Sequence, residues 1–119
     1  MPRILIVDDE LPIRQFLRRI LEQAGYDVID AADGEEAIRA ASGGSIDLLV
    51  TDLVMPGKEG IELIQHFRKS LNHVKVIAIS GVGSGKYLKM ARILGADAGL
   101  PKPFTPEELL TAIASLVPR

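Results

Sequence analysis

The sequence predicts an α/β fold in which a parallel sheet carries helices on both faces. Within 119 residues, five short apolar runs typical of buried strands alternate with five stretches that have the apolar spacing of amphipathic helices. The connections are short, and there are no internal repeats or linkers. Strands and helices that alternate in this way form a parallel sheet covered on both sides. The length fits one domain, which we expect to span residues 1–119.

The first strand is predicted over Arg3–Val7, an apolar run that stops at the consecutive acids Asp8, Asp9 and Glu10. Pro12 suits the first turn of the helix that follows, and Gly25 ends this helix. Its apolar face comprises Ile13, Leu17, Ile20, Leu21 and Ala24. The second strand is predicted over Tyr26–Ala31.

The second helix and the third strand occupy the middle of the chain. Asp33 can cap the helix, with Glu36 three residues later as in a capping box, and the pair Gly43-Gly44 ends it. Its apolar face is thin, with Ala37, Ala40 and Ala41. Leu48–Thr51 is then a continuous apolar and β-branched run, the pattern of a strand covered on both faces, and it stops at Asp52.

The third helix is predicted from Lys58 to about Ser70, because Ile61, Ile64, Phe67 and Leu71 are spaced along one helical face. Val74–Ile79 is the fourth strand, and Ser80 follows it. After the glycine-rich residues 81–85, a fourth helix has an apolar face made of Tyr87, Met90, Ala91 and Leu94. Its end is predicted at Gly95.

The last strand is brief, Ala98–Leu100, and gives way to Lys102 between two prolines. The fifth helix has a strong start: Thr105 as N-cap, proline at the first helical position and Glu108 at the third. Its apolar residues are Leu109, Leu110, Ile113 and Leu116.

Composition excludes several classes of protein. Hydrophobic residues make up 47% of the chain and charged residues 25%, which is ordinary for a globular protein. The net charge of −2 argues against a nucleic-acid-binding face. The absence of cysteine removes disulfides, thiolate metal sites and thiol nucleophiles. No signal-peptide core or membrane-spanning stretch is evident, so we expect a soluble cytoplasmic protein.

Polar residues gather where the strands end. Parallel strands all point one way, so the following residues are expected at one edge of the sheet: Asp8, Asp9, Asp52, Ser80 and Lys102. Two carboxylates about 4 Å apart repel by roughly 4 kcal/mol at an effective dielectric near 20. A hard cation such as Mg²⁺ offsets this repulsion and leaves room for a phosphate oxygen. With the Lys102 ammonium and the Ser80 hydroxyl, the set suits phosphoryl transfer to Asp52.

At these residues the chain resembles the receiver domains of two-component response regulators. The matching motifs are Ile-Val-Asp8-Asp9, Thr-Asp52-Leu-Val-Met-Pro-Gly, Ile-Ser80-Gly and Gly-Ala-Asp-Ala-Gly-Leu-Pro-Lys102-Pro-Phe. The resemblance covers essentially the whole chain. It implies a flavodoxin-like (βα)5 three-layer sandwich with strand order 2-1-3-4-5.

The resemblance also implies the roles of the site residues. Asp52 would be phosphorylated by a phosphohistidine of a sensor histidine kinase or phosphotransfer protein. Mg²⁺ would be held by Asp9 and Asp52 directly, by Asp8 through water and by the backbone carbonyl of Val54. Lys102 would contact the phosphoryl group through a loop with a cis Lys102–Pro103 bond, and the Ser80 hydroxyl would move toward the phosphate on activation.

The domain would then be a phosphorylation-controlled switch, catalysing at most its own phosphorylation and slow dephosphorylation. A downstream effector or output domain would bind the face formed by the last two helices and the strand between them. Neither nucleic acid nor membrane is an expected direct partner. The resemblance departs at Gly99, where many receivers carry a switching Tyr or Phe.

Three alternative functions fit the sequence less well. Residues 80–87 approach a P-loop, but Tyr87 replaces the Ser or Thr that would hold Mg²⁺. Phosphatases of the haloacid dehalogenase type need a second aspartate two residues after the nucleophile, where this chain has Val54. A degenerate receiver that binds partners without phosphate conflicts with the intact set of acids, serine and lysine. His66 and His73 are interpreted as surface residues.

The end of the chain has two open readings. Residues 116–119, Leu-Val-Pro-Arg, resemble the remnant of a thrombin-cleaved expression tag, in which case the domain is an excised module. Equally, Leu116 and Val117 continue the apolar side of the last helix.

Overall fold

The structure is a computed structural model that describes residues 2–53, 59–81 and 85–118. Along these residues strands and helices alternate in the following order: β1 (Arg3–Val7), α1 (Leu11–Gln23), β2 (Asp27–Ala31), α2 (Gly34–Ser42), β3 (Leu48–Asp52), α3 (Glu59–Ser70), β4 (Lys75–Ser80), α4 (Gly85–Leu94), β5 (Ala98–Pro101) and α5 (Pro106–Leu116). The predicted elements are all present, with ends that differ by a residue or two.

The strands form one parallel sheet in the order β2-β1-β3-β4-β5. This order confirms the flavodoxin-like topology that the resemblance implied. The central strand β3 lies between β1 and β4, so that Leu49 pairs with both Leu5 and Val76. All five residues of β3 are buried, as the continuous apolar run predicted.

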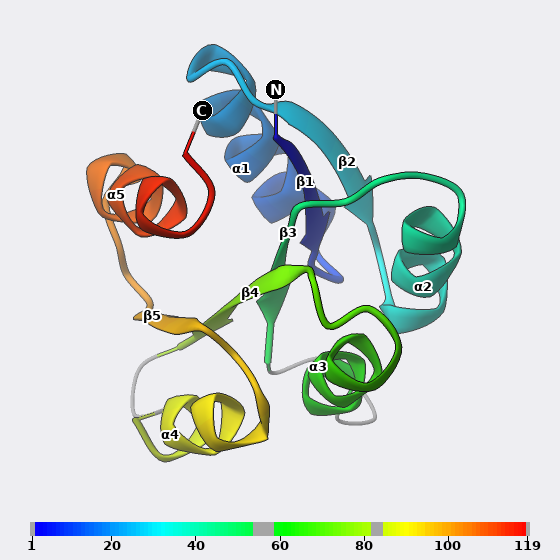
Figure 1. The fold of residues 1–119 in the computed structure, drawn as a ribbon. Helices are drawn as coiled ribbons and strands as arrows, with labels where there is room; N and C mark the ends of the chain where they lie inside the picture. The colour runs from blue at the N-terminus through cyan, green and yellow to red at the C-terminus, as the bar shows by residue number, and fades with distance from the viewer. Residues whose placement is uncertain (1, 54–58, 82–84, 119) are drawn as a thin grey trace.

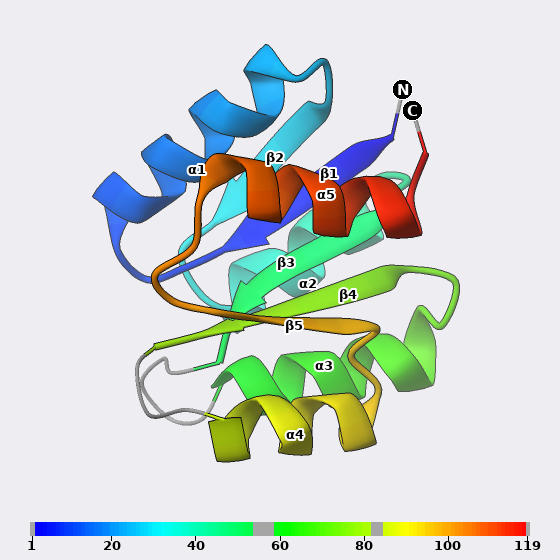
Figure 2. The ribbon, with the colours of Figure 1, turned by 90° about the vertical axis from the view of Figure 1, so that its left-hand side faces the viewer.

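Helices α1 and α5 cover one face of the sheet, and α2, α3 and α4 cover the other (Figures 1 and 2). Successive strand residues point to opposite faces. Accordingly, Ile4 and Ile6 pack in the layer beneath α1 and α5, and Leu5 and Val7 pack in the layer beneath the other three helices. The sheet therefore has a separate apolar core on each side.

The N-termini of α5 and α2 can be compared with the capping residues predicted from the sequence. At α5 the capping box is complete: the Thr105 hydroxyl accepts from the Glu108 N–H, and the Glu108 carboxylate accepts from the Thr105 N–H. At α2 the Asp33 carboxylate accepts from the Glu36 N–H as predicted. The Glu36 carboxylate, however, accepts from the N–H of Ala32, one residue before the cap.

The apolar face of α4 differs from the prediction. Ala91 is buried and Leu88 half-buried against the sheet, whereas Tyr87 is 50% exposed and Met90 41% exposed. The helix turns Leu88 and Ala91, three residues apart, to the same side, and this rotation carries Met90 away from the core. Of the glycine-rich stretch before the helix, residues 82–84 lie outside the described part.

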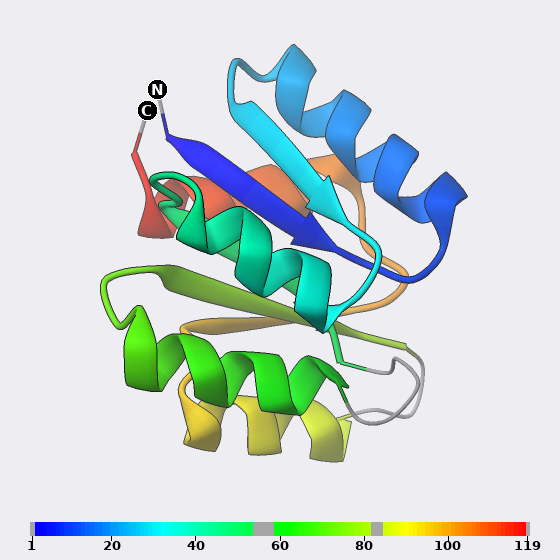
Figure 3. The ribbon, with the colours of Figure 1, turned by 90° about the vertical axis from the view of Figure 1, so that its right-hand side faces the viewer.

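The strands carry their carboxyl ends to one edge of the sheet, and the two chain termini lie at the opposite edge (Figures 2 and 3). In open parallel sheets, ligands bind at the edge where the strands have their carboxyl ends. Over the described residues, no helix has both the length and the apolar character that crossing a membrane requires.

Candidate functional site

Two adjacent strands bring carboxylates to this edge. Asp52 is the last residue of β3, and Asp8 directly follows β1. Both are buried, Asp8 at 2% exposure and Asp52 at 7%. Asp9, one residue further into the loop, is exposed. Two of the three predicted acids are therefore held inside the protein, where a charge needs a partner.

Lys102 supplies a cation for both buried acids. Its Nζ lies 3.2 Å from Oδ2 of Asp52 and 4.0 Å from Oδ2 of Asp8. The residue follows β5, and its backbone N–H donates to the carbonyl of Ser80 at the end of β4. The Lys102–Pro103 bond is cis, as the resemblance implied. The loop after β5 thus places the ammonium above β1 and β3.

Burial makes the Asp8 carboxylate difficult to ionise. Its pKa is raised above the ordinary value of 3.8, chiefly because burial penalises the charged form. The negative charges of Asp52 and Asp9 raise this pKa further, while the N–H of Glu10 and the charge of Lys102 act in the opposite direction. Among the described residues, the charge of Lys102 therefore leaves part of the repulsion uncompensated.

The Ser80 side chain is fully buried, and its hydroxyl has no hydrogen-bond partner among the described residues. Leaving a buried hydroxyl unsatisfied costs about 1 to 3 kcal/mol. Ser80 ends β4, the strand next to β3, and so belongs to the same edge as Asp52. A hydroxyl held there without a partner can donate a hydrogen bond to an oxygen of a bound ligand.

The loop after β1 contains an acidic group that can hold a metal ion. Carboxylate oxygens of Asp8, Asp9 and Glu10 lie within 4.8 Å of one another. Glu10 was not among the predicted site residues, although the run of three consecutive acids in the sequence could have indicated it. Asp52 is not one of these three, and Val54 lies outside the described residues. Carboxylate oxygens are hard ligands, so the donor set fits Mg²⁺.

Gly60 allows helix α3 to start close to the end of β3. A Cβ at this position would lie 2.4 Å from the backbone oxygen of Asp52 and 2.6 Å from the Cα of Leu53. Sequence reasoning missed this requirement, since nothing local shows that the two backbones meet. The glycine therefore helps to fix the backbone that carries Asp52.

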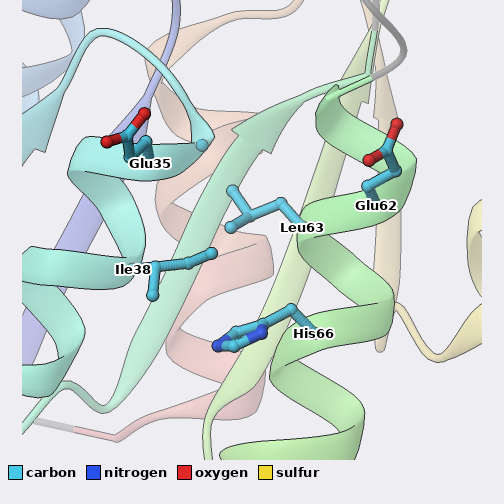
Figure 4. A pocket seen from close by; sticks show the side chains of 6 residues that line it. Glu35, Ile38, Glu62, Leu63 and His66 are labelled. Atoms are coloured by element: carbon cyan, nitrogen blue, oxygen red, sulfur yellow. The ribbon is translucent and has the colours of Figure 1, made fainter.

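A groove of about 460 Å³ runs between α2 and α3 (Figure 4), and none of the predicted site residues lines it. Its walls include Glu35, Ile38 and Leu63, together with the half-buried His66. The His66 ring also contacts Phe67, with the ring centroids 6.1 Å apart. His66 thus serves packing at a surface groove, apart from the acidic edge.

Comparisons with known proteins agree with this geometry. A family model for the response regulator receiver domain matches residues 4–114. The transcriptional regulatory protein CpxR of Escherichia coli K12 is 39% identical over 119 residues, and CpxR of Klebsiella pneumoniae is 37% identical. The alignments cover 100% of this chain and 50% of each CpxR, so the chain spans about half the length of these curated relatives.

Solved structures show the same fold. A response regulator receiver domain protein from Clostridium thermocellum superposes with a TM-score of 0.92 at 32% identity, over 98% of this chain and 94% of that one. NtrX from Brucella abortus gives a TM-score of 0.93 at 28% identity, over 98% of this chain but only 27% of the longer protein. With its acids, serine and lysine at one sheet edge, the chain belongs to the response regulator receiver domains, the signalling modules of two-component systems.

Proposed function

We propose that residues 1–119 act as one receiver domain whose phosphoacceptor is Asp52. The observation that carries this proposal is the placement of the Lys102 ammonium 3.2 Å from the Asp52 carboxylate. The buried, unpartnered hydroxyl of Ser80 adds a hydrogen-bond donor at the same edge. Together they offer one nucleophile, one cation and one donor for a phosphoryl group.

In the proposed reaction, an Asp52 carboxylate oxygen attacks the phosphorus of a phosphohistidine. The new O–P bond forms as the P–N bond breaks, and the imidazole, protonated on its other ring nitrogen, leaves as the neutral ring with the electron pair of the broken bond. Lys102 balances the charge of the phosphoryl oxygens, and Ser80 donates a hydrogen bond to one of them. A carboxylate oxygen attacks without losing a proton, so the step needs no general base.

We propose Mg²⁺ as the cofactor, held by Asp9 and Asp52, by Asp8 through water and by the backbone carbonyl of Val54. When bound, this ion supplies charge neutralisation between the carboxylates and the phosphoryl oxygens. The acidic group formed by Asp8, Asp9 and Glu10 supports the assignment. So does the raised pKa of Asp8, because a divalent cation would favour its charged form.

The proposed partners are a sensor histidine kinase or phosphotransfer protein and, downstream, an effector or output domain on the α4-β5-α5 face. The relatives support an output domain, since this chain matches only half of CpxR. We place the exchange in the cytoplasm. The domain is a switch that undergoes slow self-dephosphorylation at most, because Val54 cannot position or deprotonate an attacking water.

Output through β5 is proposed to proceed without an aromatic switch. Gly99 lies under Leu88 of α4, whose Cδ2 is 3.2 Å from the position a Cβ would take at residue 99. A Cβ at this position would require the Leu88 side chain to give way by a few tenths of an ångström. We therefore propose that Leu88 is the α4 residue through which β5 acts at this position.

The test is incubation with Mg²⁺ and a small acyl phosphate or phosphoramidate, followed by intact-mass measurement. The expected result is a single phosphate adduct that requires Mg²⁺ and is absent in Asp52→Asn. A matched control is Asp97→Asn, on an aspartate outside the site. Adduct formation by Asp52→Asn would overturn the site assignment, and no adduct in a protein that binds Mg²⁺ would indicate a phosphorylation-independent interaction module.

A further inference from the structure

One arginine joins helix α1 to the ends of both β1 and β2. The Arg14 side chain is only 13% exposed, and its Nη1 donates to the backbone carbonyl of Asp8 at 2.7 Å. Its Nε donates to Oδ2 of Asp30 at 3.1 Å. The planar guanidinium makes both contacts at once, which a lysine ammonium on a single flexible stem does less well.

These contacts fix the backbone of the acidic loop. The N–H of Asp8 donates to the carbonyl of Ala31 on β2, and the carbonyl of Asp8 accepts from Arg14. The N–H of Glu10 donates to the Asp8 carboxylate at 2.8 Å, which closes the turn. Repulsion among the loop's carboxylates favours spreading of the loop, and the bonds at Asp8 oppose it.

The positive charge of Arg14 is paired with a carboxylate that lies outside the acidic loop. Arg14 contacts the backbone oxygen of Asp8, while its ionic partner is the carboxylate of Asp30 on β2. A second arginine, Arg18, holds the other oxygen of Asp30 at 2.9 Å and orients the carboxylate. A cation near the acidic loop would repel a metal ion, so pairing with Asp30 lets Arg14 position the loop without that competition.

We infer that Arg14, held by Asp30, is a positioning residue for the metal site and sets the affinity of the domain for Mg²⁺ without touching the ion. This inference rests on the proposed function, since it concerns the same acidic loop. Groups that orient metal ligands typically contribute 10- to 100-fold to metal affinity. The loop ligands depend on Arg14 in this way, through the backbone of Asp8.

Arg18 provides a matched control. It shares Asp30 with Arg14, and it also donates to the carbonyl of Val28 and to the carboxylate of Glu22. All three partners lie outside the acidic loop. Arg18→Met therefore disrupts the same ion-pair network and costs stability, yet it leaves the Asp8 carbonyl bonded to Arg14.

The experiment titrates the full chain with MgCl₂ by calorimetry and measures urea unfolding of each variant. Arg14→Met is expected to weaken Mg²⁺ binding about tenfold, and Arg14→Lys to weaken it as well because the two-point contact is lost. Arg18→Met is expected to stay within about twofold of the parent despite a comparable loss of stability. Asp30→Asn, which preserves side-chain volume, is expected to weaken binding by leaving the Arg14 charge unbalanced.

Unchanged Mg²⁺ affinity in Arg14→Met, full affinity in Arg14→Lys, or an equal loss in Arg18→Met would each overturn the positioning role. Those results leave the proposed function standing if Asp52 still takes phosphate. Absence of Mg²⁺ binding by the parent chain would overturn both proposals. If Arg14→Met does not fold, Asp30→Asn decides the matter by the same titration.

Discussion

Lys102 and Asp52 are 50 residues apart in the chain, yet Nζ of the lysine lies 3.2 Å from Oδ2 of the aspartate. The lysine side chain is 31% exposed, whereas that of Asp52 is 9% exposed. The pair therefore sits at the boundary between the core and solvent. A partly exposed cation stabilises a buried acid there while remaining accessible to a phosphoryl group.

Removing this cation should slow phosphorylation. Lys102→Met is expected to lower the rate of phosphate adduct formation about a hundredfold, by analogy with the loss of one transition-state donor. Mg²⁺ should bind at least as tightly, because a competing positive charge has left the site. Intact-mass measurements over time give the rate. Lys86→Met, which replaces an exposed lysine that is not one of the site residues, is the control. An unchanged rate in Lys102→Met would show that the lysine only balances charge in the resting protein.

The buried Ser80 hydroxyl should cost stability in the unphosphorylated domain. Ser80→Ala removes an unsatisfied polar group and is expected to raise the free energy of unfolding by about 1 kcal/mol. Urea unfolding measures the change. The control is Ser115→Ala on the surface of α5, where the hydroxyl donates to the carbonyl of Ala112 and the expected change is within about 0.5 kcal/mol. A clear loss of stability in Ser80→Ala would contradict this account.

Asp8 should destabilise the metal-free domain at neutral pH. Its pKa is raised in the folded state, so the folded protein binds more protons than the unfolded chain above the ordinary value of 3.8. The contribution of Asp8 to the free energy of unfolding therefore falls as pH rises through that window. Asp8→Asn is therefore expected to be more stable than the parent in urea unfolding at pH 7 without Mg²⁺.

Two comparisons check this prediction for Asp8. The difference between the variant and the parent should shrink below the ordinary pKa, where Asp8 is protonated in both states. Saturating Mg²⁺ should stabilise the parent more than the variant, because only binding to the folded state shifts the equilibrium. Equal stability of the two proteins at pH 7 without Mg²⁺ would contradict the idea of a strained acid.

Gly60 should be far less tolerant of a methyl group than Gly85. A Cβ at residue 60 would meet the backbone of Asp52, whereas one at residue 85 would meet nothing within 4 Å. Gly60→Ala is expected to cost about 1 to 3 kcal/mol and to slow phosphorylation by shifting the Asp52 backbone. Gly85→Ala, at the start of α4, should be neutral or slightly stabilising. Thermal unfolding and adduct formation measure both effects, and equal tolerance at the two positions would contradict the close approach.

The sequence predicted what depends on local pattern or on the shared direction of parallel strands. The run Leu48–Thr51 gave a buried strand, the start at Thr105 gave a capped helix, and the direction rule gathered Asp52, Ser80 and Lys102 at one edge. Alternation alone left the strand order open, and the resemblance supplied it. The strand and the helix cap could be predicted because each depends on near neighbours in the sequence, and the shared edge because all strands of a parallel sheet run in one direction.

What the sequence missed depends on contacts between distant segments. The pairing of Arg14 with Asp30 spans 16 residues and has no periodic signature. The approach of Gly60 to the Asp52 backbone is visible only once α3 is placed. Met90 was expected to pack because it continued an apolar pattern, and only the rotation of α4 against the sheet decides otherwise.

The sheet also acts as a partition. Ile4 and Ile6 of β1 contribute to one apolar layer, Leu5 and Val7 to the other, and among the residues that the structure describes the two layers have no side chain in common. Substitutions that repack one layer need no compensation in the other. The surfaces of α1 and α5 can therefore diverge in evolution separately from those of α2, α3 and α4. A chimera that takes one whole layer from a relative should fold around the same acidic edge.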